Sequence, residues 1–278
     1  MKNILKIMLM MITIFTIAGS AVYAAEIPVS DQDQLITSSD WTEISNLQDE
    51  MKKEEPDATI DYDKALKVYV DCNLIKLQTA DTKKLTSALE SANYVWVIPF
   101  KMEKTYGMFT VAKGLPLREE AKSVLTKAEQ EEVKNHAGKW MITETAEHTV
   151  EPYYDILLEK REALSDCTRV VLVGSQPGMR QPVALGMDDE TARIWISLGY
   201  QYPVMEKIPE TQNVESGVYS FESVADISDT YIEDSEVSTG AGVQSRSSMK
   251  YVAGIGIIVI GSILILSVLK KKKLEDYE

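Results

Sequence analysis

The stretch "KALKVYVD", Lys64–Asp71, alternates apolar and polar side chains and is the first clear strand of the chain. Leu66, Val68 and Val70 fall on one face of it, a period of two that is typical of a half-buried strand. The next stretch, "DTKKLTSALESAN" at residues 81–93, has apolar side chains at helical spacing behind Asp81, a favoured N-cap residue. A strand followed by a helix therefore opens the folded part of the chain.

Two further strands complete a first unit. "YVWVIPF" at residues 94–100 is apolar on both faces, which indicates an interior strand. "TYGMFTVAK" at residues 105–113 follows closely enough to form a hairpin with it. Residues 57–114 are thus predicted to form a β-α-β-β unit.

A helical linker is expected next. Thr126 and Glu129 have the spacing of a capping box, in which each residue bonds the backbone N–H of the other. Gly138 stands where a helix commonly ends in the left-handed conformation. The sequence therefore predicts a helix over about residues 127–137.

The same order of elements then recurs over residues 139–202. "KWMITETAE" indicates a strand, "EPYYDILLEKREALSD" a helix, "TRVVLVG" a fully buried strand, and "QPVALGM" and "ARIWISLG" two more strands. The recurrence favours an internal duplication with halves 57–114 and 139–202. We expect an α+β fold of tandem β-α-β-β-like units, with helices on one face of two small mixed sheets or one larger sheet.

The segments on either side of this domain are more polar. Residues 25–56 are acidic and are expected to form a polar leader with a short helix at Trp41–Met51. Residues 203–249 are also acidic and poor in core residues, which predicts a disordered stalk. Within it, "GVYSFESVADI" at residues 217–227 would add a last strand or serve as a docking motif.

The two ends of the chain have the sequence patterns of a secretory signal peptide and a membrane-spanning helix. Residues 250–269 contain an uncharged run, Tyr251–Leu269, which as a helix would be about 28 Å long and close to the thickness of a bilayer core. Lys270–Lys273 follow it, so the positive-inside rule puts the tail, residues 270–278, in the cytoplasm. Residues 1–24 have the basic start, apolar run and small residues of a secretory signal peptide, the alternative being an uncleaved anchor. We expect a single-pass cell-membrane protein with its N-terminal domain outside the cytoplasm.

The amino-acid composition of the chain limits the kinds of molecule that it is expected to bind. The formal net charge is −14 at pH 7, and the lysine-rich ends leave the acidic excess in the middle of the chain. Such a field repels nucleic acid, which is therefore excluded as a partner. Cys72 and Cys167 are the two cysteines, and no Asn begins an N-glycosylation sequon, a combination that favours a bacterial surface protein. The two cysteines would either form a disulfide or pack as small apolar side chains.

The sequence contains few patterns that indicate catalytic or metal-binding residues. His136 and His148 lack partners at metal-ligand spacing. The carboxylates in Met187–Glu190 and Ile60–Asp63 could form an acid–base pair, but polar turns explain them better. Trp96, Trp140 and Trp195 lie in predicted strands and are expected in the core, whereas Gly199–Pro203 is where exposed aromatic rings are expected.

No catalytic, cofactor-binding or metal-binding residue is therefore assigned. We expect a non-enzymatic binding protein, attached to the membrane through its single span, with an envelope component or another membrane protein as partner. The alternatives are an extracytoplasmic hydrolase that uses carboxylates such as Asp188, Asp189 and Glu190, and an accessory subunit of a membrane sensor or transport complex.

Overall fold

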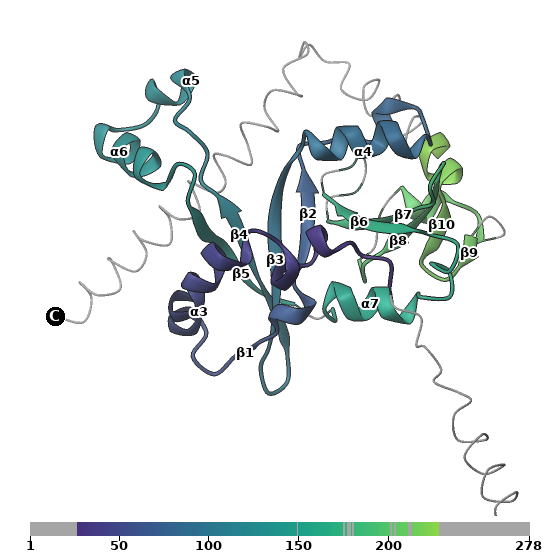
Figure 1. Cartoon of the computed structure of the whole chain (residues 1–278), viewed down its shortest axis with the longest axis horizontal. Helices are drawn as coiled ribbons and strands as arrows, with labels where there is room; N and C mark the ends of the chain where they lie inside the picture. The colour runs from purple at the N-terminus through teal and green to yellow at the C-terminus, as the bar shows by residue number, and fades with distance from the viewer. Residues whose placement is uncertain are drawn as a thin grey trace, which may run out of the picture.

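The computed structural model describes residues 27–227, apart from residues 149, 175, 177, 178, 180, 201, 203, 211 and 212. The strands of this part of the chain form one ten-stranded mixed sheet in the order β5-β4-β3-β2-β6-β7-β8-β10-β9, with β1 paired to β3 (Figure 1). The α+β class is confirmed, with one large sheet rather than two small ones. The strands are β1 (Thr59–Ile60), β2 (Leu66–Val70), β3 (Asn93–Lys101), β4 (Tyr106–Lys113), β5 (Trp140–His148), β6 (Arg169–Val173), β7 (Val183–Met187), β8 (Ala192–Ser197), β9 (Asn213–Glu215) and β10 (Val218–Ser220).

Short helices connect the strands. Three local signals are confirmed: the Asp81 carboxylate caps α4 by accepting two backbone N–H groups, Thr126 and Glu129 form the capping box of α6, and Gly138 has a φ of 74° just after that helix. The α-helices are α2 (Trp41–Ile44), α3 (Gln48–Glu54), α4 (Thr82–Glu90), α5 (Glu119–Lys122), α6 (Lys127–His136) and α7 (Tyr153–Glu159).

A short parallel pair, β2 and β6, joins two antiparallel halves of the sheet. β5 lies at one edge beside β4, so β4, β3 and β2 separate it from β6. The predicted halves 57–114 and 139–202 are consequently not two equivalent parts of the sheet, because the first strand of the second half pairs within the first.

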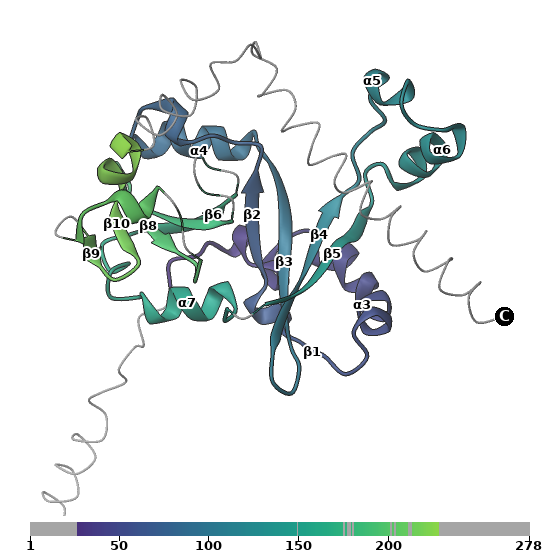
Figure 2. The ribbon, with the colours of Figure 1, turned by 180° about the vertical axis from the view of Figure 1, so that it is seen from behind.

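The helices cover both faces of the sheet, so the expectation that they lie on one face is wrong. Leu85 of α4 packs in one apolar cluster with Val171 of β6, whereas Leu157 of α7 packs in another with Val170. Neighbouring residues of a strand point to opposite faces. Because β6 is apolar on both, it needs cover on both, and Figures 1 and 2 show α4 and α7 on opposite sides of it.

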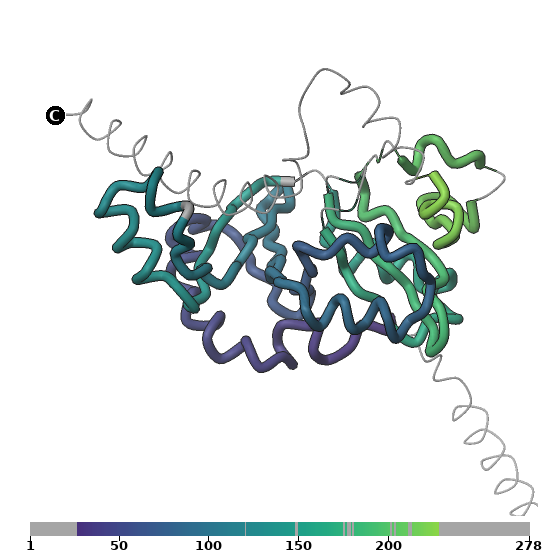
Figure 3. Tube along the Cα trace, turned by 90° about the horizontal axis from the view of Figure 1, so that it is seen from above, coloured from purple at the N-terminus to yellow at the C-terminus, as the bar shows by residue number. Residues whose placement is uncertain are grey.

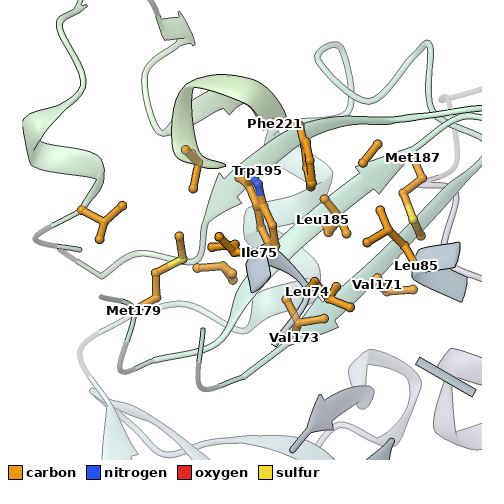
Figure 4. Packing of buried hydrophobic residues seen from close by; sticks show 14 of the residues in the cluster. Leu74, Ile75, Leu85, Val171, Val173, Met179, Leu185, Met187, Trp195 and Phe221 are labelled. Atoms are coloured by element: carbon orange, nitrogen blue, oxygen red, sulfur yellow. The ribbon is translucent and has the colours of Figure 1, made fainter. Parts of the chain in front are cut away.

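The core beside α4 extends into the predicted stalk. Phe221 stacks on Trp195 with ring centroids 5.7 Å apart (Figure 4), and β10 pairs with β8. Val204 and Val224 are fully buried in the same cluster, and Val218 is fully buried in the cluster beside α7. Residues 204–227, apart from 211 and 212, therefore belong to the folded domain, and "GVYSFESVADI" does supply a last strand.

The N-terminal segment, which was expected to be a polar leader outside the domain, also belongs to the fold. Leu35, Ile44 and Met51 are each fully buried, in a third cluster with Trp96 and Phe109. Figure 3 shows this segment, in purple, running along one side of the molecule. Its apolar residues are few, but several of them are fully buried, so composition alone underestimated its packing.

Part of this segment fills the place where β2 and β6 separate. The two strands pair through Val68 with Leu172 and through Tyr69 with Val173. Beyond these pairs, Val29 forms a bridge to Val170 and Gln34 forms one to Leu66. We name residues 28–35 the wedge, because they bond to both central strands.

No helix in the described part of the chain, residues 27–227 with their gaps, is long and apolar enough to cross a membrane. The predicted signal peptide at residues 1–24, the predicted span at residues 250–269 and the tail at residues 270–278 lie outside the described residues.

Candidate functional site

The acidic residues 188–190 form the turn between β7 and β8. Asp188 Oδ1 accepts the backbone N–H groups of Glu190 at 2.8 Å and Thr191 at 2.6 Å, and these bonds hold the pKa of the Asp188 carboxyl below its usual range. Asp189 Oδ1 accepts the hydroxyl of Thr168 at 2.9 Å. The carboxylates are thus occupied in shaping a hairpin, as the polar-turn interpretation predicts.

The acidic stretch Ile60–Asp63 borders a small pocket of about 120 Å³. Lys64 Nζ lies 3.7 Å from Asp61 Oδ2 and 2.8 Å from Asp155 Oδ2, and the bond to Asp155 raises the pKa of Lys64. Pockets that hold organic ligands usually enclose about 300 Å³ or more. This pocket therefore accommodates an ion pair rather than a substrate.

The histidine and cysteine side chains that the structure describes do not gather with other metal-ligating residues. No group of three or more His, Cys, Asp or Glu residues within the described ranges could hold a metal ion. His136 ends α6, and the backbone of His148 ends β5. Cys72 and Cys167 are both free thiols on opposite faces of the sheet, and burial raises the pKa of each to about 11. They pack as apolar side chains, which was one of the two alternatives.

The tryptophans of the strands are core residues, as predicted. Trp96 and Trp195 have no exposed surface and Trp140 is 7 % exposed. The expectation of exposed rings at residues 199–203 is wrong for Tyr202, which is 2 % exposed and donates its hydroxyl to the carbonyl of Pro182. These rings do not provide a flat surface for a sugar.

A two-helix arm, residues 114–139, projects from the ends of β4 and β5 (Figures 1 and 2). It closes at its base, where Gly114 N–H donates to the Lys139 carbonyl at 2.9 Å and Gly138 N–H donates to the Gly114 carbonyl at 2.8 Å. Because β4 and β5 already meet there, the sheet needs no more than a tight turn at this point. The rest of the arm is additional to the fold.

The arm contributes nothing to the described core. None of its described side chains is buried, and α6 presents a mostly charged surface. Val124, between α5 and α6, is 75 % exposed and Leu115 is 41 % exposed. Val124 is the most exposed large apolar side chain among the described residues, so the arm is the candidate contact surface of this domain.

A second feature, a buried polar cluster, lies under the wedge. The Asp33 side chain is 2 % exposed. Its Oδ1 accepts the Tyr69 hydroxyl at 2.7 Å, and its Oδ2 accepts the Ser30 hydroxyl at 2.6 Å and Arg169 Nη2 at 3.0 Å. Asp33 thereby connects the wedge to both β2 and β6.

Lys67 is the remaining member of the cluster. Its side chain is 11 % exposed, and its Nζ lies 3.7 Å from Asp33 Oδ1. The same nitrogen lies 4.6 Å from the ring centroid of Tyr94 and 5.2 Å from that of Trp96. Removal from water lowers the pKa of Lys67, although Asp33 acts in the opposite direction.

Asp40 fixes the aromatic wall around Lys67. Its Oδ2 accepts the Tyr94 hydroxyl at 2.9 Å and Trp96 Nε1–H at 3.0 Å. Burial raises the pKa of Tyr94 to about 12. The rings are therefore held against the ammonium group by a carboxylate that is itself buried.

Sequence reasoning missed this cluster because Asp33 stands in the polar stretch "DQDQ" and Lys67 alternates with apolar residues as a solvent-facing side chain would.

Comparison of the chain with protein-family models, with curated proteins and with solved structures finds no match.

Proposed function

We propose that this chain is a membrane-anchored, non-enzymatic binding protein of a bacterial cell surface, and that its extracytoplasmic domain contacts an envelope component or another membrane protein. In this proposal the arm at residues 114–139, between the two predicted units, carries the contact surface. A helix at residues 250–269 spans the membrane, and residues 270–278 lie in the cytoplasm. The uncharged run before Lys270–Lys273 and the signal-peptide pattern of residues 1–24 support this orientation.

The arm at residues 114–139 is the observation that carries the proposal. A tight turn would close the sheet at Gly114 and Gly138, yet the chain inserts two helices that bury none of their described side chains. Exposed apolar residues on an element that does not stabilise the core favour a contact with another molecule.

The hairpin at residues 188–190 favours binding over hydrolysis. A general acid needs a carboxyl group that holds its proton near neutral pH. Asp188 has the opposite environment, since two backbone N–H groups stabilise its ionised form. The described residues thus offer the binding proposal more support than the carboxylate-dependent hydrolase.

Site-specific photo-crosslinking in intact cells tests the proposal. A crosslinking residue at position 124 should attach the chain to a defined partner, and Val124→Glu should reduce that complex at least several-fold. Val214 is the matched control, because it is also exposed, at 57 %, but lies on the edge strand β9. Equal crosslinking from positions 124 and 214, or none from either, would refute the arm as a contact surface.

Replacement of residues 115–137 by a two-residue turn separates contact from folding. The thermal unfolding temperature should change little, while the crosslinked complex should disappear. Protease added to intact protoplasts tests the orientation: residues 27–227 should be accessible, whereas a tag after Glu278 should remain protected.

A further inference from the structure

The cluster around Asp33 places an amine and a carboxyl group together where water is scarce. Lys67 Nζ lies 3.7 Å from Asp33 Oδ1, with side-chain exposures of 11 % and 2 %. From this geometry we propose that Lys67 and Asp33 form an intramolecular amide bond, a covalent crosslink between the wedge and β2.

The groups around Asp33 suit attack by the amine. Oδ2 accepts hydrogen bonds from the Ser30 hydroxyl at 2.6 Å and from Arg169 Nη2 at 3.0 Å. These two donors would stabilise negative charge on this oxygen in a tetrahedral intermediate. Oδ1 accepts a hydrogen bond from the Tyr69 hydroxyl at 2.7 Å and is the oxygen nearer to Lys67. The carboxyl carbon thus faces the amine with Oδ2 held by two donors, and Oδ1, beside the Tyr69 hydroxyl and Lys67, is the oxygen that leaves.

Formation of the amide is balanced in atoms and protons and needs no further reactant. Lys67 begins as an ammonium and Asp33 as a carboxylate. One proton passes from Nζ to Oδ1, Nζ attacks Cγ, and a C–N bond forms. A second proton passes from Nζ to the same oxygen, the Cγ–Oδ1 bond breaks, and Oδ1 leaves as water. The product is a neutral amide that keeps one N–H.

Burial supplies the driving force. Lys67 and Asp33 are costly to keep charged out of water even when paired, whereas an amide that keeps its hydrogen bonds is not. Its formation also removes the repulsion between Lys67 and Arg169, whose side chain is 24 % exposed and remains in contact with water. Tyr94 and Trp96 exclude water beside Lys67, and burial lowers the pKa of its ammonium, which increases the fraction of nucleophilic amine. Holding the two groups in place raises the effective concentration of one near the other.

A second Lys–Asp pair shows why proximity is not sufficient. Lys64 Nζ lies closer to its partner, 2.8 Å from Asp155 Oδ2, but the side chains are 34 % and 29 % exposed. Water stabilises both ions there and would compete with the amine. This pair is therefore expected to remain ionic and is an internal control.

Peptide mapping of the full chain, extracted from membranes in detergent and then denatured, tests the proposal. Trypsin does not cleave after an acylated lysine, so residues 65–76 should stay uncut at Lys67 and be joined to the peptide that ends at Lys52 and contains Asp33. The joined peptides should weigh one water less than their sum. No such product should contain Lys64.

Two variants complete the test. Lys67→Arg keeps the positive charge but lacks the amine, so its map should show residues 68–76 released in full and no crosslinked product. Lys64→Arg should keep the crosslink. Complete cleavage after Lys67 in the natural chain would overturn the proposal, and this result does not depend on whether either variant folds. A crosslink at Lys64 as abundant as at Lys67 would overturn the role given to burial.

Discussion

Replacement of Ile44 by Ala tests whether the N-terminal segment is part of the core. Ile44 lies in α2 and has no exposed surface, in the cluster that contains Trp96. The change removes three carbon atoms, which at roughly 0.8 kcal/mol each amounts to about 2.4 kcal/mol of lost burial. The cavity left behind raises the expected loss in the free energy of unfolding to about 3–4 kcal/mol.

Ile36→Ala is the matched control, because Ile36 belongs to the same segment but is 38 % exposed. It should cost about 1 kcal/mol or less. Urea unfolding of the purified chain in detergent, followed by tryptophan fluorescence, measures both losses, since Trp96 and Trp140 report on the same cluster. A loss below about 1 kcal/mol for Ile44→Ala, or equal losses for the two variants, would refute the packing described for this segment.

Two further predictions concern the sheet. Cys72 and Cys167 should react with iodoacetamide roughly 100-fold more slowly in the native chain than in the urea-unfolded chain, because burial raises each thiol pKa from 9.0 to about 11 and the thiolate is the nucleophile. Equal rates in native and unfolded protein would contradict it. Gly107→Ala should lower the free energy of unfolding by about 1–3 kcal/mol, because its new methyl group would meet the ring of Phe100 on the neighbouring strand. Gly174→Ala, whose methyl group would make ordinary contacts at 3.6 Å, should cost less in the same urea titration.

Features that depend on near neighbours in the chain could be predicted from the sequence. The cap at Asp81, the capping box of Thr126 with Glu129 and the left-handed Gly138 each involve residues within one turn of the helix that they bound. The strands likewise follow from alternating or continuous apolar runs. In each case the physical cause lies in a few consecutive residues.

The placement of helices and flanking segments could not be predicted in this way. Nothing in α4 or α7 alone says which face of the sheet each will cover, and the apolar residues of the flanks are too sparse to show periodicity. Leu35 and Ile44 are buried because β3 and β4 present Trp96 and Phe109 to them. That surface exists only after residues far apart in the sequence have paired.

The candidate contact surface was predicted only in outline. The capped helix expected at about residues 127–137 was interpreted as a linker between two halves, but the strands on either side of it are neighbours, so the segment forms an arm. Its lack of burial follows from the pairing of β4 with β5. Sequence patterns report the helix but not that pairing.

The wedge explains why the boundary expected at residue 57 cannot divide the molecule. Before the proposed amide forms, Lys67 on β2 and Arg169 on β6 repel each other across the short parallel pair, and this repulsion contributes, after burial, to the lowered pKa of Lys67. Asp33 lies between them and compensates both charges. A chain that began at residue 57 would lose that carboxylate, the bridges to Val170 and Leu66, and the cover over the third cluster. The polar N-terminal segment therefore supplies the carboxylate that lets the two cations approach as the sheet forms, and the two halves of the sheet depend on this segment to stay joined.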